Sequence, residues 1–169
     1  MSFKVNCSFS YGTHLPGLIK AMSKTTGDVL ELGMGVFSTP YLHYQCILSN
    51  RKLVSYENYK NWMQKFLDSE YDCENHEINF VEKYSDAKIE KGWSVALVDQ
   101  TPDSSRTEEI RRLANHTEYI VIHDAAERQN HIYHYDTIYP LFKYRADWDE
   151  ESNPAVVLSN FHNLEDFWK

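Results

Sequence analysis

The residues best placed to bind a ligand are two glycines that follow a short apolar run. Gly33 and Gly35 come directly after residues 29–32, and a Ser-Thr-Pro sequence typical of a helix start follows them. Because glycine has no Cβ, such a turn lets backbone N–H groups approach a ligand, and the helix start favours negative charge. The pattern predicts a nucleotide-type cofactor site; the alternative is a plain strand-to-helix turn.

The residues around the two glycines indicate which kind of cofactor fits. A dinucleotide-binding loop has a glycine or alanine in the position of Ser38, and the carboxylate of Glu31 would repel a pyrophosphate. The same carboxylate suits a ligand that carries the ammonium group of an amino acid. The loop therefore favours another adenosine cofactor over a dinucleotide.

Glu57 and Asp86 carry carboxylates that could complete such a site. Glu57 ends the predicted strand 52–56, where a carboxylate can accept hydrogen bonds from both hydroxyls of a ribose. Asp86 follows the predicted strand 76–81, where a carboxylate could accept a hydrogen from an adenine amino group. Asp86 could equally cap a following helix.

Asp99, His123 and Asp124 form a second group of candidate chemical residues. They end two further predicted strands, 93–99 and 119–123. A histidine or a carboxylate can accept a proton from a reacting group, and two carboxylates can hold Mg²⁺, which prefers oxygen ligands. The alternative for His123 and Asp124 is a capping or packing pair at a strand end.

Two further residues could face a substrate. His14 stands before a predicted helix and could close over a cofactor or substrate, or simply flank the helix cap. Arg106 opens the helix after Asp99 and could meet an anionic substrate. His131 and His134, with His116 and His123, could suggest a zinc site. A zinc site would need four ligands at a finger-like spacing, which these histidines do not provide, so we expect solvated or stacked side chains.

Short apolar runs alternate with polar helical stretches, the pattern of an α/β domain. The predicted strands are 29–32, 52–56, 76–81, 93–99, 119–123, 138–145 and 155–161. The predicted helices are 15–24, 38–48, 59–69 and 106–115, with a helical segment after Asp86. These make five β-then-α units and a terminal antiparallel hairpin.

Right-handed crossovers would lay these units out as one doubly wound, mostly parallel sheet with helices on both faces. In such sheets ligands bind beyond the carboxyl ends of the strands, and the candidate residues stand at those ends. The length of 169 residues fits one domain. We divide it into an N-terminal extension and helix (1–26), a cofactor-binding β/α core (27–135) and a closing hairpin with tail (136–169).

The composition indicates which kinds of partner and which cellular compartment to expect. The net charge is −8, from 17 basic and 25 acidic residues, so a broad phosphate-neutralising surface is not expected and nucleic acid is an unlikely partner. Cys7, Cys46 and Cys73 are odd in number and form no CxxC pair, as in proteins whose thiols stay reduced. Residues 1–6 lack a signal-peptide layout, and no apolar run approaches the roughly 18 residues of a membrane span. We therefore expect a cytoplasmic protein.

Four motifs together resemble a known family. ELGMG at 31–35, KLVSYE at 52–57, SDA at 85–87 and ALVDQTP at 96–102 resemble the successive motifs of class I S-adenosylmethionine-dependent methyltransferases. The resemblance extends over roughly residues 11–161 and implies a seven-stranded sheet of order 3-2-1-4-5-7-6. More narrowly, five segments are similar to small stand-alone sugar O-methyltransferases of bacteria and viruses: YGTHLPGL, GDVLELGMGVFSTPYLH, the Asp99-containing loop with Arg106, YIVIHDAAE and VVLSNF.

The resemblance implies roles around the glycine loop. Gly33 and Gly35 would lie under the methionine and ribose parts of S-adenosylmethionine. Glu31 would reach the ammonium group of the cofactor, directly or through water. Ser38 and Thr39 would donate to its carboxylate at the helix start. Many family members have a third glycine in this loop where this chain has Phe37, a departure that puts the detailed shape of the loop in question.

The remaining roles fall on the other strand ends. Glu57 would hold the ribose hydroxyls, Asp86 would face the adenine, and Asp99 would lie beside the sulfonium methyl group. A sugar hydroxyl is a poor acid, so its methylation needs a base or a metal. Either His123 or Asp99 would accept the proton, or Asp99 and Asp124 would hold Mg²⁺. Metal-dependent relatives usually carry a further carboxylate or amide after the second ligand, where this chain has Ala125.

The resulting hypothesis is methyl transfer from S-adenosylmethionine to a hydroxyl of a sugar, glycan or other small molecule. Two alternatives stay open: methylation of a nucleic-acid or protein acceptor, and a module that binds the cofactor without turnover. The sequence leaves open whether copies of the chain associate into a homo-oligomer.

Overall fold

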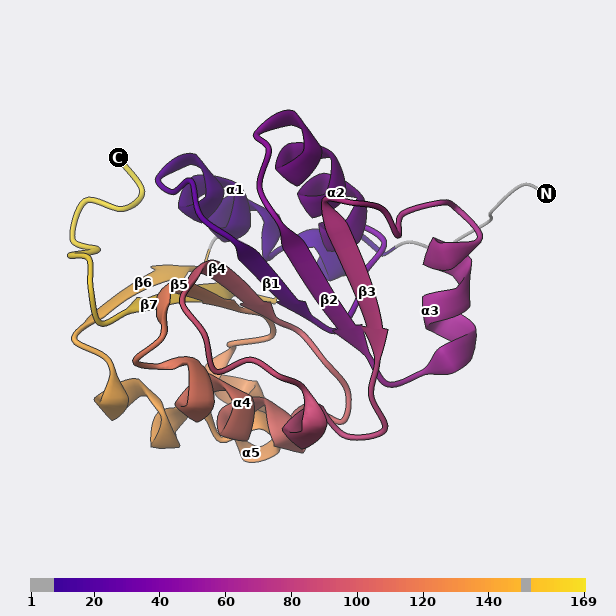
Figure 1. The fold of residues 1–169 in the computed structure, drawn as a ribbon. Coiled ribbons are helices and arrows are strands. Elements are labelled where there is room, and N and C mark those ends of the chain that lie inside the picture. Colours follow the sequence, from indigo (N-terminus) through magenta and orange to yellow (C-terminus); the bar gives the residue numbers. More distant parts are fainter. Residues whose placement is uncertain (1–7, 150–152) are drawn as a thin grey trace.

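The computed structural model describes residues 8–149 and 153–169, and its centre is a seven-stranded sheet. The strand order is β3-β2-β1-β4-β5-β7-β6, as predicted (Figure 1). β1 to β5 pair in parallel, and β7 runs antiparallel to both β5 and β6. The strands are β1 Val29–Leu32, β2 Leu53–Glu57, β3 His76–Phe80, β4 Trp93–Val98, β5 Thr117–Ile122, β6 Tyr144–Trp148 and β7 Ala155–Ser159.

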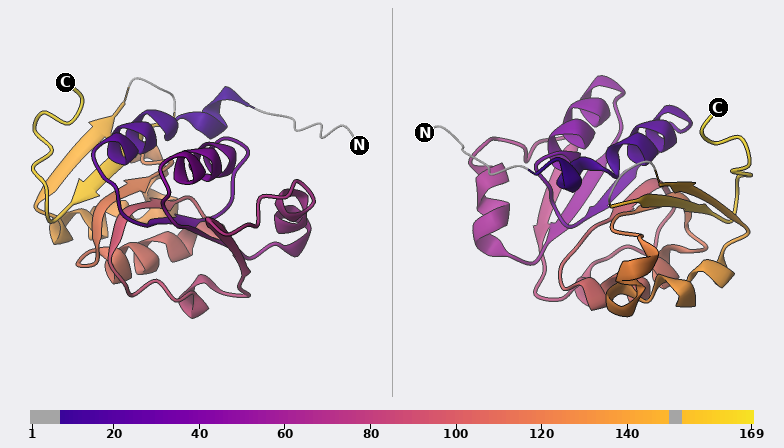
Figure 2. Two further views of the ribbon diagram at one scale, coloured as in Figure 1. Left: turned by 45° about the horizontal axis from the view of Figure 1, so that its top comes forward. Right: turned by 180° about the vertical axis from the view of Figure 1, so that it is seen from behind.

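Helices cover both faces of the sheet. α1 and α2 lie on one face, α4 and α5 lie on the other, and α3 lies beyond the β3 edge (Figures 1 and 2). The α-helices are α1 Leu15–Ser23, α2 Ser38–Leu48, α3 Lys60–Leu67, α4 Arg106–Leu113 and α5 Asn130–Tyr133. The connections hold short 3₁₀ turns: η1 Phe9–Gly12, η2 Tyr84–Asp86, η3 Asp103–Ser105, η4 Glu127–Gln129, η5 Tyr135–Thr137 and η6 Tyr139–Leu141.

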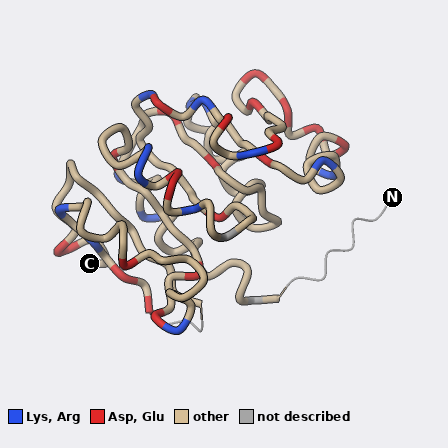
Figure 3. The backbone as a smooth tube through the Cα atoms, turned by 90° about the horizontal axis from the view of Figure 1, so that it is seen from below, with Lys and Arg blue, Asp and Glu red and all other residues tan. Residues whose placement is uncertain are grey.

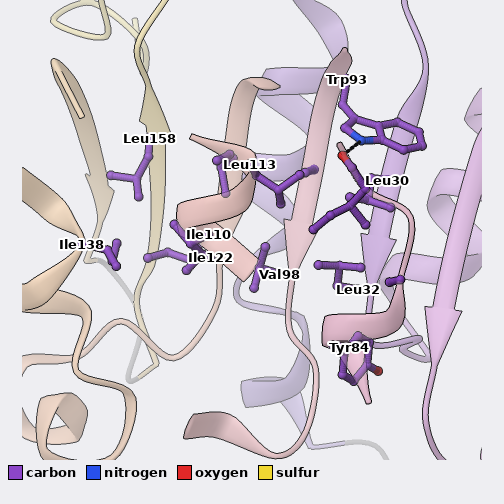
Figure 4. Close-up of a cluster of buried hydrophobic side chains, with 14 of the residues drawn as sticks. Leu30, Leu32, Tyr84, Trp93, Val98, Ile110, Leu113, Ile122, Ile138 and Leu158 are labelled. Atoms are coloured by element: carbon purple, nitrogen blue, oxygen red, sulfur yellow. Dashed lines mark hydrogen bonds between the residues drawn. The ribbon is translucent and has the colours of Figure 1, made fainter. Parts of the chain in front are cut away.

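The core has one apolar layer on each face of the sheet, because side chains alternate along a strand. On the α4 face, Leu30 and Leu32 of β1 pack with Ile110 and Leu113 (Figure 4). Fully burying such a side chain contributes about 1.5–3 kcal/mol. Glu31 lies between the two leucines in the sequence, so its side chain points to the opposite face, toward α2. This alternation determines what the carboxylate of Glu31 can contact.

Two predicted elements are wrong. The run 138–145 is not a strand: its first part forms η6, and β6 begins only at Tyr144. Pro140 lies inside that run and has no N–H to donate to a strand ladder, whereas it suits a 3₁₀ turn. The helical segment expected after Asp86 is also absent, since only η2 and an extended connection separate β3 from β4. The third unit is therefore not a β-then-α unit, and the N-cap alternative for Asp86 fails.

Lys and Arg residues are interspersed with Asp and Glu residues along the described backbone (Figure 3). No helix in residues 8–149 and 153–169 is long and apolar enough to cross a membrane. Cys46 is a buried free thiol and Cys73 an exposed one, while Cys7 lies outside the described residues.

Candidate active site

Two adjoining cavities lie at the carboxyl ends of β1, β2, β4 and β5. The larger has a volume of about 470 Å³, and its lining includes His14, Asp99 and His123. The smaller has a volume of about 320 Å³, and its lining includes Gly33 and Glu57. Trp62, Asp99 and Thr101 line both cavities, so the two form one groove across the sheet edge.

The glycine loop is the floor between the two cavities. Gly33 has φ +86°, and a Cβ there would lie 2.6 Å from the Gln100 Cα and 2.7 Å from the Asp99 carbonyl carbon. Both atoms belong to the backbone that follows β4, so no side-chain rotation relieves the clash. A Cβ on Gly35 would lie 2.8 Å from the Ser38 Oγ. The steric requirement for glycine is therefore firm at Gly33, whereas at Gly35 a rotation of the Ser38 side chain would relieve the contact.

Glu31 lies beneath the loop rather than in the groove. Its side chain is fully buried and accepts hydrogen bonds from the Thr39 hydroxyl, at 2.9 and 3.1 Å, and from the Ser55 hydroxyl, at 2.6 Å. Burial raises the pKa of Glu31 to about 7, against the opposing effect of these hydrogen bonds. Glu31 does not line either cavity, so the structure gives the ammonium-binding role no direct contact surface.

Ser38 and Thr39 start α2, as predicted, and both are buried. The Thr39 hydroxyl is already committed, because it donates to Glu31 and accepts the Gly35 N–H at 2.9 Å. The Ser38 hydroxyl also lies near Glu31, and its hydrogen bond to that carboxylate helps to lower the pKa of Glu31. Neither hydroxyl lines either cavity, so each would need a local movement to reach a methionine carboxylate.

Glu57 is fixed at the end of β2 by the backbone around it. Its carboxylate accepts N–H hydrogen bonds from Met34 at 3.1 Å, Asn58 at 2.9 Å and Tyr59 at 2.8 Å. Burial raises the pKa of Glu57, and these three bonds oppose the rise. A carboxylate offers about four acceptor positions, so one remains toward the smaller cavity. Glu57 lines the smaller cavity, and its ribose role stays a prediction.

Asp86 is exposed at the end of η2 and does not line either cavity. Asn58 and Tyr59, which the sequence analysis did not single out, form part of the wall of the smaller cavity. Their position directly after Glu57 could have predicted this, because residues that follow the end of a strand lie at the same edge of the sheet.

Arg106 links the two carboxylates of the larger cavity. Its Nη2 lies 2.9 Å from Asp99 Oδ1, and its Nη1 lies 3.5 Å from Asp124 Oδ2. The Nε of Arg106 donates to the Gln100 carbonyl at 2.8 Å, and the guanidinium stacks 4.8 Å from the Tyr133 ring centre. Arg106 is 3% exposed and lines the larger cavity, where its guanidinium is already paired with both carboxylates.

The residues expected to hold Mg²⁺ do not fit the ion. Both carboxylates would have to face a shared space with oxygen ligands around it. Asp99 and Asp124 both line the larger cavity, but the guanidinium of Arg106 already lies against both of them, and a second cation there would be repelled. Among the described residues, the metal-type side chains that come together are His14, Asp99 and His123, with ligand atoms within 4.8 Å. His131 and His134 are exposed on or beside α5 and are not part of this group.

His123 is held from both sides. Its Nδ1 lies 3.2 Å from Asp99 Oδ1 and 3.6 Å from Asp124 Oδ2, and its Nε2 lies 2.9 Å from the Thr13 hydroxyl. Burial alone would lower the pKa of His123, but the hydrogen bond and charge of Asp99 raise it above the usual value. Burial would likewise raise the pKa of Asp99, but the hydrogen bond from His123 and the charge of Arg106 lower it to about 2. Both groups are thus stabilised in their charged forms.

His14, unlike His123, is not stabilised in its charged form. It is 1% exposed, its ring lies 4.8 Å from that of His123, and its Nδ1 is 4.0 Å from Asp99 Oδ2. Neither ring nitrogen has a hydrogen-bond partner among the described residues. Burial lowers the pKa of His14 to about 4, although Asp99 opposes the shift. The imidazole is therefore neutral at pH 7.

This shift predicts a pH dependence of stability. A histidine whose pKa falls from 6.5 to about 4 on folding stabilises the fold above pH 6.5, and that stability is lost as the pH falls toward 4. We expect the unfolding free energy of the wild type to fall relative to that of His14→Gln across this window. Urea unfolding of both proteins between pH 7 and 4 measures it. A difference that stays constant would contradict the buried neutral state.

Several residues that shape the site were not predicted. Thr13 holds His123, and the Tyr133 hydroxyl donates to Asp124 at 3.1 Å. The Tyr135 hydroxyl donates to the His123 carbonyl at 3.1 Å. Thr13 stands in the YGTHLPGL motif beside His14, which was a usable signal, whereas the tyrosines come from a segment whose course the sequence did not indicate.

Comparison of the sequence with models of protein families finds no match, and comparison with curated proteins finds none either. Solved structures do resemble the fold. The N-methyltransferase NodS from Bradyrhizobium japonicum WM9 has a TM-score of 0.63 at 9% identity, over 88% of this chain and 94% of that one. A methyltransferase from Pyrococcus furiosus has a TM-score of 0.57 at 10% identity, over 96% of this chain and 89% of that one.

A chain of the Pnkp1/Rnl/Hen1 RNA repair complex also matches, with a TM-score of 0.59 at 11% identity. The match covers 92% of this chain and 42% of that chain. At such identities the likeness is one of fold, and it confirms the predicted class I methyltransferase architecture. The narrower resemblance to sugar O-methyltransferases receives no specific support from these structures.

Proposed function

We propose that this protein transfers a methyl group from S-adenosylmethionine to a hydroxyl group, with a sugar or glycan as the acceptor class. The observation that carries the proposal is the continuous groove that joins Glu57 to the cluster around Asp99. One end offers a fixed carboxylate for a ribose, the middle offers bare backbone at the glycine loop, and the other end offers buried groups for proton transfer. The methyltransferase fold supports the same assignment.

The chain's own residues fit the cofactor in a defined order. Glu57 accepts from one ribose hydroxyl through its remaining acceptor position, and Gly33 and Gly35 let the methionine part lie against the backbone. Ser38, at the start of α2, donates to the methionine carboxylate once its hydroxyl turns toward the groove. Glu31 acts on the ammonium group through water, because its side chain does not line either cavity. When bound, S-adenosylmethionine supplies a methyl group made electrophilic by the adjacent sulfonium.

Two further assignments complete the cofactor site. Asp99 lies where the groove passes from one cavity to the other, beside the methyl group to be transferred. Asp86 faces the adenine only with a movement of the η2 connection, because it does not line the smaller cavity in this structure.

The lining of the larger cavity supports a neutral, hydroxyl-bearing acceptor. Tyr11 and Trp62 offer aromatic surface, and Asn153 and Thr101 offer polar groups near the mouth. Flat rings with a few polar neighbours are the common way to bind and orient a small ligand. The charged groups deeper in the cavity are already paired, so they do not call for a charged acceptor.

A nucleic-acid acceptor remains the second candidate. The net charge of −8 counts against it, whereas one structural neighbour belongs to an RNA repair complex. Lys65 lines the larger cavity and lies 4.5 Å over the Trp62 ring, an arrangement that could also receive a base and its phosphate. Direct measurement of methyl transfer separates the two acceptor classes.

That measurement uses S-adenosylmethionine with a radiolabelled methyl group. The acceptors are neutral mono- and oligosaccharides, a single-stranded RNA and a lysine-rich peptide. Label in the saccharides supports the proposed acceptor class, and label in the RNA or the peptide alone overturns it. If the wild type binds the cofactor, Asp99→Ala binds it equally well and neither transfers label, the protein is a non-catalytic binding module.

Replacing Glu57 by glutamine should weaken the binding of S-adenosylhomocysteine by about 1–3 kcal/mol, the usual range for losing a hydrogen bond to a charged group. Isothermal titration calorimetry at pH 7 measures the affinity. The matched control is Glu77→Gln, an exposed position on β3, which should leave the affinity unchanged. Equal affinities for both variants would remove Glu57 from the ribose site.

A further inference from the structure

Two histidines line the same cavity 4.8 Å apart, yet their hydrogen bonding differs completely. Both ring nitrogens of His123 have partners, in Asp99 and Thr13. Neither ring nitrogen of His14 has one among the described residues. Counting the hydrogens at these contacts determines which of the two can accept a proton.

The count begins at the Thr13 hydroxyl, which has one hydrogen. Its Oγ1 lies 2.5 Å from the Asn153 carbonyl oxygen, a contact that requires the hydrogen to lie between the two oxygens because a carbonyl cannot donate. The Thr13 oxygen must then accept from His123, whose Nε2 is 2.9 Å away. The Nε2 of His123 therefore carries a hydrogen.

The other nitrogen of His123 carries a hydrogen as well. Its Nδ1 faces Asp99 Oδ1 at 3.2 Å and Asp124 Oδ2 at 3.6 Å. Carboxylate oxygens accept hydrogen bonds and repel a lone pair, and Asp99 is kept ionised by Arg106 at 2.9 Å. His123 is therefore an imidazolium with no lone pair to offer. It cannot serve as the base that the sequence analysis allowed it to be.

His14 has the lone pair that His123 lacks. It is buried and lines the cavity, and its Nδ1 lies 4.0 Å from Asp99 Oδ2. The charged groups around it are Asp99, Asp124, Arg106 and His123, two negative and two positive, so they sum to zero. A proton that arrives on His14 meets the carboxylate of Asp99, whose Oδ2 is 4.0 Å away, while Arg106 Nη2 and His123 Nδ1 lie 2.9 and 3.2 Å from Oδ1 of the same carboxylate.

We infer that His14 is the general base of the methyl transfer and that His123 is a permanently protonated positioning residue. The inference rests on the proposed function. The acceptor oxygen forms a bond to the methyl carbon while the carbon–sulfur bond breaks and its electron pair stays on sulfur. The proton of the acceptor hydroxyl moves to a ring nitrogen of His14 and then to solvent. His123 holds Asp99 in place and keeps it charged.

The first test needs no acceptor. Nuclear magnetic resonance of ¹⁵N-labelled histidine side chains, assigned with His14→Gln and His123→Gln, reports the hydrogens on each ring nitrogen. At pH 7 we expect His123 with both nitrogens protonated and His14 neutral, with S-adenosylhomocysteine present or absent. A bare nitrogen on His123, or an imidazolium at His14, overturns the assignment.

The second test measures turnover with the saccharide that accepts most label. His14→Gln should lower kcat by about 100- to 10,000-fold, the usual contribution of a general base, while KM changes less than about threefold. The wild-type rate should reach a plateau at neutral pH, whereas the residual rate of His14→Gln should keep rising with pH. The matched control is His116→Gln, exposed beside β5 at the opposite edge of the sheet, which should retain the wild-type rate. A kcat of His14→Gln within threefold of the wild type overturns the base.

Calorimetry separates the failure of this inference from the failure of the proposed function. His14→Gln should bind S-adenosylhomocysteine with the wild-type affinity, which also shows that the variant is folded. If the wild type itself does not bind the ligand, the proposed function fails. The resonance measurement still decides the protonation states in that case.

Discussion

Replacing Arg106 by methionine is expected to lower the free energy of unfolding by about 3–5 kcal/mol, the cost of breaking a buried ion pair by removing one partner. The guanidinium is buried and contacts both Asp99 and Asp124. Methionine fills a similar volume but leaves two carboxylates close together without a cation between them. Urea unfolding at pH 7 measures the loss.

The matched control lies on the same helix. Arg111 is exposed on α4 and bonds Thr137, so Arg111→Met should change stability by less than about 1 kcal/mol. Adding Asp99→Asn to Arg106→Met should recover part of the loss, because one of the unpaired charges is then removed. Equal losses for Arg106→Met and Arg111→Met would mean that the guanidinium is not the centre of the cluster.

Replacing Gly33 by alanine is the second substitution with a large expected effect, a loss of about 2–4 kcal/mol in stability. The left-handed backbone costs a residue with a Cβ roughly 1–2 kcal/mol, and overpacking typically costs about 1–3 kcal/mol more. The added Cβ would meet the backbone of Asp99 and Gln100 at 2.6–2.7 Å. β1 and β4 must then separate at the point where the groove passes between its two cavities.

Because the clash displaces the floor of the groove, Gly33→Ala should also lose most of its affinity for S-adenosylhomocysteine. Gly92→Ala is the matched control, since a Cβ at Gly92 meets nothing within 4 Å. Unfolding and calorimetry on both variants measure the two effects. A Gly33→Ala protein as stable as Gly92→Ala would show that the loop tolerates a Cβ.

The sequence predicts the sheet well, for identifiable reasons. The central strands are short apolar runs that end at a glycine or a carboxylate, and their parallel order follows from the crossovers. The placement of Glu57, Asp99 and His123 at one sheet edge follows from the same rule. Pro140 was the overlooked signal in the wrong strand prediction, because a residue without an N–H disfavours a ladder.

The chemistry within the site could not be predicted in the same way. Residue types suggested two carboxylates for a metal, but not that Arg106, the first residue of α4, would contact both of them. The different roles of His14 and His123 depend on one hydroxyl and one carbonyl, from residues 140 positions apart. Such contacts follow from packing in three dimensions and leave no periodic pattern in the chain.

We propose that an adenosine cofactor with a sulfonium lies along this groove, and a crystal structure with S-adenosylhomocysteine would show whether it does. We predict the ribose hydroxyls against Glu57, the methionine part over Gly33 and Gly35, and the sulfur beside Asp99 with the larger cavity beyond it. A ligand bound elsewhere on the chain, or no bound ligand at saturating concentration, would contradict the account.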